Sequence, residues 1–348
     1  MGLILLVDMD YFFAACEESR RPDLKDKPLV VGTAPAESKE RGVVQTCNYV
    51  ARKFGIRSAM PTAQALKLNL GLTYLQSDEP FYEQMSKKVV GIIGSYGLMM
   101  ETLSIDEVAI DSANDSYDSA MSLAESIKER INRELGLPCT IGISTSKVYA
   151  KMVCDAYKPN RIGMVRKDGL AGFMRDKEVG AILGVGPKTR LRLEEMNIRS
   201  IGDLASVDAT VLIERFGKFG GELHLISIGE DCSGIVKETD AISIGRERTI
   251  DETSDMEVIS RKIMDLAHET FEELSKKQMR FGAVGAKVRY SDFSIRTKTK
   301  KLSKPSDSLD VAYSTCISLM GPMVLGRKVR KVGIRLTELE RNSGQMKI

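Results

Sequence analysis

The spacing of apolar residues changes twice along the chain, and these changes limit the possible folds more than any other feature. Up to about residue 165, short apolar runs typical of strands alternate with amphipathic stretches typical of helices. Residues 167–232 hold only helix-like segments, whereas residues 243–341 read as strand, helix, two strands, helix and strand. We therefore predict a multidomain α+β protein with helices over one face of its first sheet, and a second, smaller βαββαβ domain.

The composition narrows the chemistry. The 348 residues suffice for two to four domains, and the charged fraction of 28% is typical of globular proteins. Two histidines and six widely spaced cysteines disfavour a histidine triad, a zinc site and a disulfide framework, and we expect the cysteines to be buried. Without an apolar run of membrane-spanning length or a signal-peptide pattern, we expect a cytoplasmic protein with no membrane partner.

Positive charge is concentrated near the C-terminus. Residues 276–335 contain 15 Lys and Arg against 3 Asp and Glu, although the whole chain carries a net charge of only +3. Cations alternate with other residues in the strand-like stretches 286–290 and 295–300, which predicts a sheet with its cations on one face. A basic sheet face is suited to nucleic-acid phosphates, and a solvated face without a partner is the alternative.

Acidic residues lie at the ends of apolar strands. Asp8 ends the first strand, where Asp10 is placed to cap the following helix, and Asp106 and Glu107 lie in a turn flanked by apolar residues. Carboxylates in such a setting are costly unless a cation neutralises them, and carboxylates without His or Cys favour Mg²⁺. The pattern points to phosphoryl or nucleotidyl transfer, with solvated strand-end acids as the alternative.

Two further sets of residues are suited to binding phosphate. If Asn48 begins a helix, Tyr49 and Arg52 share a face near its N-terminus, and with Thr46 and Lys158 they could hold a phosphate tail. For Arg52, a surface ion pair is the alternative. The turn at Gly184 and Gly186, followed by Lys188, could present backbone N–H groups to a nucleic-acid phosphate, although a plain helix–helix turn has the same pattern.

From Met1 to about Arg341, the chain resembles the Y-family translesion DNA polymerases of the DNA polymerase IV (DinB-type) branch. Five motifs in the same order carry the resemblance, at residues 7–13, 46–55, 57–61, 104–107 and 156–160. The resemblance implies a right-hand polymerase with a ferredoxin-like palm, small fingers, a helical thumb and a βαββαβ little-finger domain. The implied ranges are 1–10 and 80–165 for the palm, 11–79 for the fingers, 166–232 for the thumb, 233–242 for a linker, 243–341 for the little finger and 342–348 for a tail.

The implied activity is template-directed, low-processivity translesion synthesis by a monomer, which transfers dNMP from deoxynucleoside triphosphates to a primer–template. Two Mg²⁺ ions per active site, with Mn²⁺ as a substitute, are implied as cofactors. By resemblance, the metal ligands are Asp8, Asp106, Glu107 and the backbone carbonyl of Met9. The nucleotide-binding set is Tyr49, Arg52, Lys158, Thr46 and the backbone N–H groups of Tyr11 and Phe12, with Phe13 as a steric gate. The DNA-binding set is Gly184, Gly186, Lys188, Arg289, Arg296, Lys298 and Lys300.

Three places depart from the family pattern or extend it. Gln45 stands where relatives usually carry Ala or Ser beside the nascent base pair, and residues 237–241 are less basic than in some relatives. Residues 345–348 resemble the opening of a sliding-clamp peptide, but the chain ends before the aromatic pair, and a disordered tail is the alternative. A non-catalytic DNA-binding member and a palm-type nucleotidyl cyclase remain the competing functions.

Overall fold

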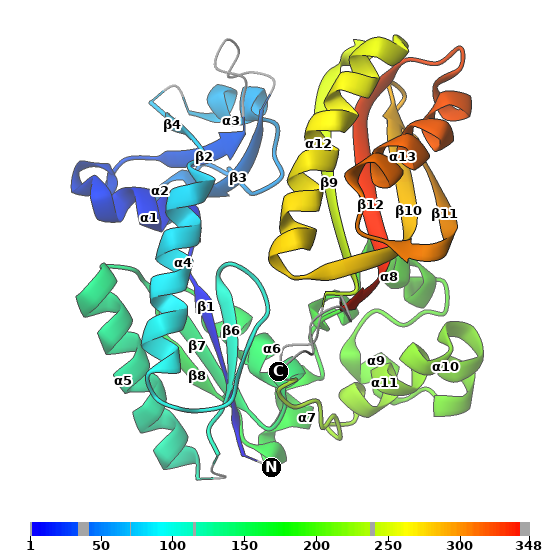
Figure 1. The fold of residues 1–348 in the computed structure, drawn as a ribbon. Helices are drawn as coiled ribbons and strands as arrows, with labels where there is room; N and C mark the ends of the chain where they lie inside the picture. Colours follow the sequence, from blue (N-terminus) through cyan, green and yellow to red (C-terminus); the bar gives the residue numbers. More distant parts are fainter. Residues whose placement is uncertain (1, 34–41, 70, 114–115, 237–240, 342–348) are drawn as a thin grey trace, which may run out of the picture. The chain divides into compact units, whose positions relative to one another are not determined.

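A computed structural model describes residues 2–33, 42–69, 71–113, 116–236 and 241–341 (Figure 1). The chain forms two compact units, residues 1–238 and 239–348, and the division falls within the segment 233–242. Each unit has its own hydrophobic core. The two units are described separately below.

The first unit is built on a mixed sheet in which β1 is central. The strand order is β5-β6-β1-β7-β8, and β1 is antiparallel to both β6 and β7. All six residues of β1 and all six of β7 are buried, so the middle of the sheet is covered on both faces. The strands are β1 (Ile4–Met9), β5 (Met100–Thr102), β6 (Glu107–Asp111), β7 (Cys139–Ser144) and β8 (Ile162–Met164).

Helices cover this sheet on both faces, whereas only one covered face was predicted. Leu5 and Val7 pack in the core that holds α4 (Glu79–Gly94) and α5 (Tyr117–Leu135). The intervening residues of β1 point the other way and pack, in a separate cluster, against α6 (Lys147–Tyr157). The prediction was wrong because successive side chains of a strand alternate between faces, and both sets in β1 are apolar.

A smaller sheet follows β1 in the chain. It has the order β3-β2-β4, with β2 (Leu29–Thr33) antiparallel to β3 (Val43–Cys47) and parallel to β4 (Thr73–Gln76). The helices of this region are α1 (Phe12–Arg20), α2 (Tyr49–Arg52) and α3 (Thr62–Leu68). The helix start considered at Asn48 is confirmed, because Asn48 is the N-cap of α2, whereas β4 was not predicted.

The start of α1 differs from the prediction. Its N-cap residue is Tyr11, with φ of 38° and no side-chain cap hydrogen bond, so Asp10 is not the cap. The Asp10 carboxylate instead accepts hydrogen bonds from the Thr140 hydroxyl and from the backbone N–H of Asn160. Asp10 therefore bonds to residues that are distant in the sequence instead of capping the helix that follows it.

Residues 167–232 are helical, as predicted. The α-helices are α7 (Leu170–Met174), α8 (Pro187–Glu194), α9 (Ile201–Ala205), α10 (Ala209–Phe216) and α11 (Lys218–Ser227). They share one core with Val148 and Met152 of α6. Gly220 permits the close approach of α10 and α11, because a Cβ there would lie 2.0 Å from the Leu212 carbonyl oxygen.

The second unit has the predicted βαββαβ order. Its elements are β9 (Ser243–Thr253), α12 (Met256–Lys276), β10 (Met279–Tyr290), β11 (Ile295–Ser306), α13 (Leu309–Val324) and β12 (Val329–Arg341). The antiparallel sheet has the order β11-β10-β12-β9. Val284, Ala286 and Val288 of β10 pack in the core beneath α12 and α13.

The cations of β10 and β11 are divided between the two faces of this sheet, so the prediction of a single basic face is wrong. Arg296 is paired with Val288 and Lys298 with Ala286, and paired residues of antiparallel strands point to the same face. Arg296, Lys298 and Lys300 of β11 therefore lie on the helix side, whereas Lys301 of β11 and the β10 cations Lys287 and Arg289 lie on the other. Arg296 and Lys300 remain exposed because β11 is an edge strand.

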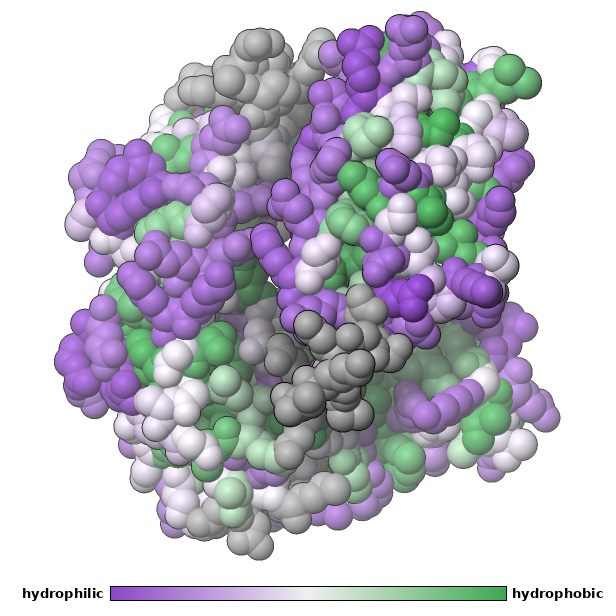
Figure 2. Space-filling view, in the orientation of Figure 1, coloured by the Kyte–Doolittle hydropathy of each residue, from purple (hydrophilic) through white to green (hydrophobic). Residues whose placement is uncertain are grey.

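The space-filling view shows hydrophilic residues over most of the visible face, with hydrophobic residues in separate patches (Figure 2). In the part of the chain that the structure describes, no helix combines the length and the apolar character needed to cross a bilayer. Five of the six cysteines are buried as expected, and Cys232 is exposed.

Candidate active site

Two acidic residues face each other at the end of the central strands of the first unit. Asp8 of β1 is paired in register with Glu107 of β6. Asp8 is 2% exposed, because β1 is flanked by strands on both sides and covered by helices on both faces. Glu107 is half-buried. The sequence prediction that these two carboxylates converge in an apolar setting is confirmed.

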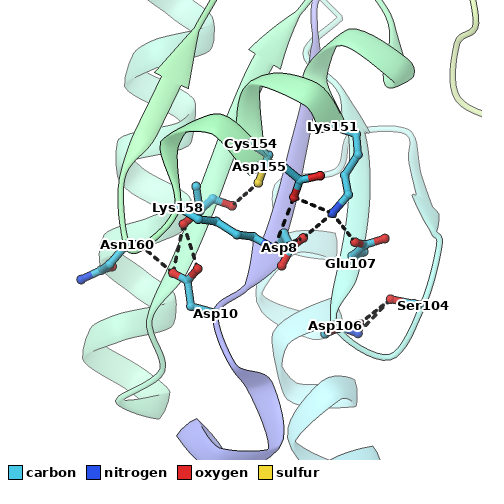
Figure 3. Close-up of polar contacts among 11 residues, drawn as sticks. Asp8, Asp10, Ser104, Asp106, Glu107, Lys151, Cys154, Asp155, Lys158 and Asn160 are labelled. Atoms are coloured by element: carbon cyan, nitrogen blue, oxygen red, sulfur yellow. Dashed lines mark hydrogen bonds and ion pairs between the residues drawn. The ribbon is translucent and has the colours of Figure 1, made fainter. Parts of the chain in front are cut away.

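Two lysines neutralise this pair. The Nζ of Lys151, on α6, lies 2.7 Å from Asp8 Oδ2 and 2.6 Å from Glu107 Oε1. The Nζ of Lys158, just after α6, lies 2.7 Å from the same oxygen of Asp8. Asp155, also on α6, forms an ion pair of 3.0 Å with Lys151. Figure 3 shows Lys151 reaching between Asp8 and Glu107 from the helix above them.

The charges shift the pKa values of these groups in different directions. Burial by itself raises the pKa of the Asp8 carboxyl. Lys151 and Lys158 lower this pKa by more than burial raises it, so the resulting pKa is below the ordinary value. Burial raises the pKa of Glu107, and the single lysine only partly offsets this. The pKa of Lys151 is raised because its two acids outweigh the effect of burial. The lysines therefore favour the ionised form of Asp8, whereas burial works against the ionised form of Glu107.

Asp106 is close in sequence but is turned away. Its Oδ1 accepts a hydrogen bond from the Ser104 hydroxyl at 2.5 Å, in the turn before β6 (Figure 3). Its backbone carbonyl accepts a hydrogen bond from the backbone N–H of Met9 at 2.9 Å. The structure therefore brings Asp8, Met9 and Glu107 together but leaves the Asp106 carboxylate outside the pair.

The donor set fits a hard divalent cation. Asp8 and Glu107 offer only oxygen atoms, which Mg²⁺ and Mn²⁺ prefer, and an ammonium group already occupies the position between them. Among the described residues, no three His, Cys, Asp or Glu side chains lie close enough to form a metal site. A third carboxylate ligand would require Asp106 to turn from Ser104.

Aromatic and basic residues adjoin this centre. The Arg52 guanidinium lies over the Tyr49 ring at 4.6 Å, and the Tyr11 ring meets the Tyr49 ring edge-on at 5.3 Å. Burial raises the pKa of Tyr49 and of Tyr11, so both phenols are neutral hydrogen-bonding groups. The structure thus places Tyr49 and Arg52 on one face, as predicted. Thr46, at the end of β3, is 9% exposed.

Phe13 lies on the first turn of α1. Its ring stacks on the Tyr82 ring of α4, with centroids 4.5 Å apart and an interplanar angle of 13°. Phe12 is buried in the core at 3% exposure, whereas Phe13 is half-buried. A flat, partly accessible ring in a fixed orientation suits a residue that limits the shape of a ligand.

A buried polar network supports this region, and it was not predicted from the sequence. The Asn48 amide group donates to Glu18 and to the Lys27 carbonyl, both at 2.8 Å, and accepts from the backbone N–H of Ala51 and Leu29. Asn48 thereby joins α1, β2 and α2. The only sequence signal was the predicted helix start at Asn48.

Lys151 and the role of Asp10 were also missed from the sequence. Lys151 precedes Lys158 by seven residues, or two helical turns, and its neighbours in sequence, Ala150 and Met152, are both buried. A lysine in such an apolar stretch is the signal that could have revealed it. Gln45 is also noteworthy, because its side-chain oxygen is buried without a hydrogen-bond partner.

The predicted DNA-contacting residues lie elsewhere. Gly184 has φ of +94°, and Gly186 is the N-cap of α8, on which Lys188 is exposed. The other members of the set are the strand cations of the second unit, Arg289 on β10 and Arg296, Lys298 and Lys300 on β11.

Comparisons with known proteins agree with this architecture. Residues 7–155 match the impB/mucB/samB family, and residues 241–348 match its C-terminal domain. DNA polymerase IV of Methanoculleus marisnigri is 35% identical, with 97% of this chain and 94% of the relative covered. DNA polymerase IV of Cronobacter sakazakii is 36% identical, with 98% and 97% covered.

Solved structures give the same result. The Y-family DNA polymerase chimera Dbh-Dpo4(243-245)-Dbh superposes with a TM-score of 0.90 at 27% identity, covering 98% of this chain and all of the chimera. The insertion ternary complex of Dbh DNA polymerase has a TM-score of 0.70 at 28% identity and the same coverage.

The chain belongs to the Y-family of DNA polymerases, in its DNA polymerase IV branch. It is a DNA-directed DNA polymerase, a nucleotidyltransferase that depends on divalent metal. The predicted family, fold class and enzyme class are confirmed.

Proposed function

We propose that the chain extends a primer across damaged template by nucleotidyl transfer at a centre formed by Asp8, Glu107 and Asp106. The observation that carries this proposal is the pairing of Asp8 with Glu107 on adjacent strands, neutralised by a cation between them. A buried carboxylate pair is costly without a cation, so the fold is built to hold positive charge there.

The metal ligands in this proposal are Asp8, Asp106, Glu107 and the backbone carbonyl of Met9. Two Mg²⁺ ions, for which Mn²⁺ can substitute, would make the primer 3′-OH acidic and neutralise the triphosphate and the leaving pyrophosphate. Burial raises the pKa of Asp8, but its two lysines lower it by more, and the ionised carboxylate that they favour would anchor the site. Asp106 would leave Ser104 to complete it.

The incoming deoxynucleoside triphosphate would lie between Arg52 and Lys158. Tyr49, Arg52 and Lys158, with Thr46 and the backbone N–H groups of Tyr11 and Phe12, would bind its phosphates. The contact between Arg52 and Tyr49 supports this assignment because it orients both side chains. Phe13 would exclude a ribose 2′-OH, and its stacking on Tyr82 holds the ring in place for that role.

The primer–template would be bound by both units. We assign the palm to 1–10 and 80–165, the fingers to 11–79, the thumb to 166–232, the linker to 233–242 and the little finger to 243–341. Gly184, Gly186 and Lys188 would contact primer phosphates, and Arg289, Arg296, Lys298 and Lys300 would contact the duplex from the little finger. The ternary and binary Dbh complexes among the solved relatives support binding of substrates by this fold.

Three further assignments concern the setting of the enzyme. We propose that it acts as a monomer and that it works in the cytoplasm. We also propose that residues 345–348 open a sliding-clamp peptide, and these lie outside the described residues. Pull-down by a clamp that is lost when residues 342–348 are deleted is the expected result.

Primer extension on undamaged and abasic templates tests the function. We expect the full chain with Mg²⁺ and deoxynucleoside triphosphates to extend both primers, adding few nucleotides per binding event. Binding of DNA without extension would favour a non-catalytic member. Release of pyrophosphate with a cyclic nucleotide product and no need for template would favour a cyclase.

A further inference from the structure

Lys151 occupies the position between the two paired carboxylates of the active centre. It contacts Asp8 at 2.7 Å and Glu107 at 2.6 Å, and its side chain is 16% exposed. An ammonium group at this position neutralises the two acids as a divalent cation would. Both cannot occupy the same position, because like charges at such short range repel strongly.

The structure also provides a second position for this side chain. Asp155 lies one turn further along α6 and already contacts the Lys151 ammonium at 3.0 Å. The Asp155 side chain is 49% exposed, so an ion pair formed there alone would be open to solvent. Lys151 can therefore leave Asp8 and Glu107 without becoming an unpaired buried charge.

We propose that Lys151 is a built-in counter-ion that holds the metal position closed and moves to Asp155 when a divalent cation binds. The proposal rests on the assignment of Asp8 and Glu107 as metal ligands. It makes Lys151 a positioning residue rather than a catalytic one, since it acts by keeping the two acids together and neutral. It implies that the metal-free enzyme is stable and that metal binding includes the cost of displacing an ion pair.

The chain contains a closely matched control. Lys147 lies one turn earlier on α6, its side chain is 14% exposed, and it forms an ion pair of 2.7 Å with Glu101. Its burial and ion-pair length match those of Lys151, but its acid belongs to a different part of the sheet. Replacing either lysine removes one positive charge from the same helix. Only the replacement of Lys151 also removes the group that lies between Asp8 and Glu107.

Binding of Mn²⁺ to the full chain, without DNA or nucleotide, is the direct test, with free Mn²⁺ followed by electron paramagnetic resonance. We expect Lys151→Met to bind Mn²⁺ about tenfold more tightly than wild type or tighter still, and Lys147→Met to bind as wild type does. Equal affinity in wild type and Lys151→Met would overturn the proposal. An equal gain in both variants would also overturn it, because it would reflect a general loss of positive charge.

Asp8→Asn separates this inference from the proposed site. Loss of Mn²⁺ binding in Asp8→Asn together with unchanged binding in Lys151→Met would leave the site intact and reject the role of Lys151. Unchanged Mn²⁺ binding in Asp8→Asn would instead reject the assignment of Asp8 as a ligand.

A measurement on the wild-type chain does not depend on whether a variant folds. Brief acetylation by an amine-reactive reagent, read by mass spectrometry, reports how accessible each lysine is. We expect labelling of Lys151 to rise several-fold on addition of Mn²⁺, while labelling of Lys147 stays constant. Constant labelling of Lys151 at saturating Mn²⁺ would show that the side chain does not move.

Discussion

The two acids that share Lys151 differ in burial and in the direction of their pKa shifts. Asp8 is almost fully buried, and two lysines hold its pKa below the ordinary value. Glu107 contacts one lysine, and burial raises its pKa. As pH falls, Glu107 is therefore protonated first and Asp8 last. Asp8 therefore keeps its negative charge to a lower pH than Glu107 does.

Asp106 provides the first test at the scale of single residues. We expect Asp106→Ala to slow nucleotide addition by about three decades or more, because a metal ligand is lost at the reacting phosphate. Affinity for primer–template should change only a few-fold, since the cations that bind DNA lie elsewhere. Single-turnover extension and fluorescence anisotropy measure the two quantities.

The control for this variant lies on β6, the strand that follows Asp106. Asp111, at the other end of β6, accepts a hydrogen bond from the Ala113 backbone and does not touch the site. Asp111→Ala should extend primers at close to the wild-type rate. Retention of a tenth of wild-type activity by Asp106→Ala would reject its role as a ligand.

Phe13 provides the second test. We expect Phe13→Ala to lower the ratio of kcat/KM for dCTP over CTP by about tenfold or more, because removing the ring relieves a clash with the ribose hydroxyl. Use of dCTP itself should fall little, since the ring excludes one substrate rather than attracting the other. Steady-state kinetics with each nucleotide measure the ratio, and an unchanged ratio would place the gate at another residue.

At the scale of elements, regular patterns were predictable and long-range placement was not. The helical segment 167–232 and the strand–helix order of the second unit are confirmed. Strands β4 and β8 were missed because runs of three or four residues carry too little periodicity. The faces of the β11 cations were mistaken because they depend on register with β10, which no single strand encodes.

In the active site, too, the contacts between residues far apart in the chain could not be predicted from the sequence. The convergence of Asp8 and Glu107 was predictable because each charge interrupts an apolar strand pattern. The contact with Lys151 was not, since it depends on α6 crossing the back of β1. The hydrogen bonds of Asp10 to Thr140 and Asn160 likewise join residues far apart in the chain.

Asn48 tests how the elements around the nucleotide site are joined. Its buried amide bonds to α1, β2 and α2, so Asn48→Ala removes the partner of the backbone N–H groups of Leu29 and Ala51 and one of the two hydrogen bonds to the Glu18 carboxyl, which keeps the Tyr11 hydroxyl. We expect the free energy of unfolding to fall by about 2–4 kcal/mol. Urea denaturation measures the change.

Asn69 is the matched control for this substitution. Its side chain accepts one exposed hydrogen bond, from the backbone N–H of Gly71 at 2.7 Å. Asn69→Ala should therefore change the free energy of unfolding by about 0.5 kcal/mol or less. A similar loss in both variants would show that the Asn48 network does not stabilise this region.

At the scale of the whole molecule, catalysis is assigned to the first unit, and the second unit is assigned a large share of the binding energy for DNA. Deletion of everything after Ala241 removes the second unit and leaves the cores of the first intact. If about four cations of the second unit contact phosphates, they contribute a log–log salt slope of roughly −3.6, or about two decades of affinity between 50 and 200 mM salt. We expect the truncated chain to lose this slope and to add one or two nucleotides per binding event.

Anisotropy across a salt series measures the slope in both proteins. In the full chain, alanine at Arg296, Lys298 and Lys300 should flatten it by up to about 2.7, at roughly 0.9 for each phosphate that is no longer neutralised. An unchanged slope in the truncated chain would mean that the cations of the second unit face solvent or a different partner.

Single-turnover primer extension by Asp8→Asn tests the central assignment most directly. Asparagine keeps the shape of the side chain and removes the charge that Lys151 and Lys158 pair with. With folding verified by circular dichroism, we predict a rate at least about three decades below wild type, with affinity for primer–template within a few-fold. Extension by Asp8→Asn at a tenth of the wild-type rate or faster would contradict the assignment of the paired carboxylates as the catalytic centre.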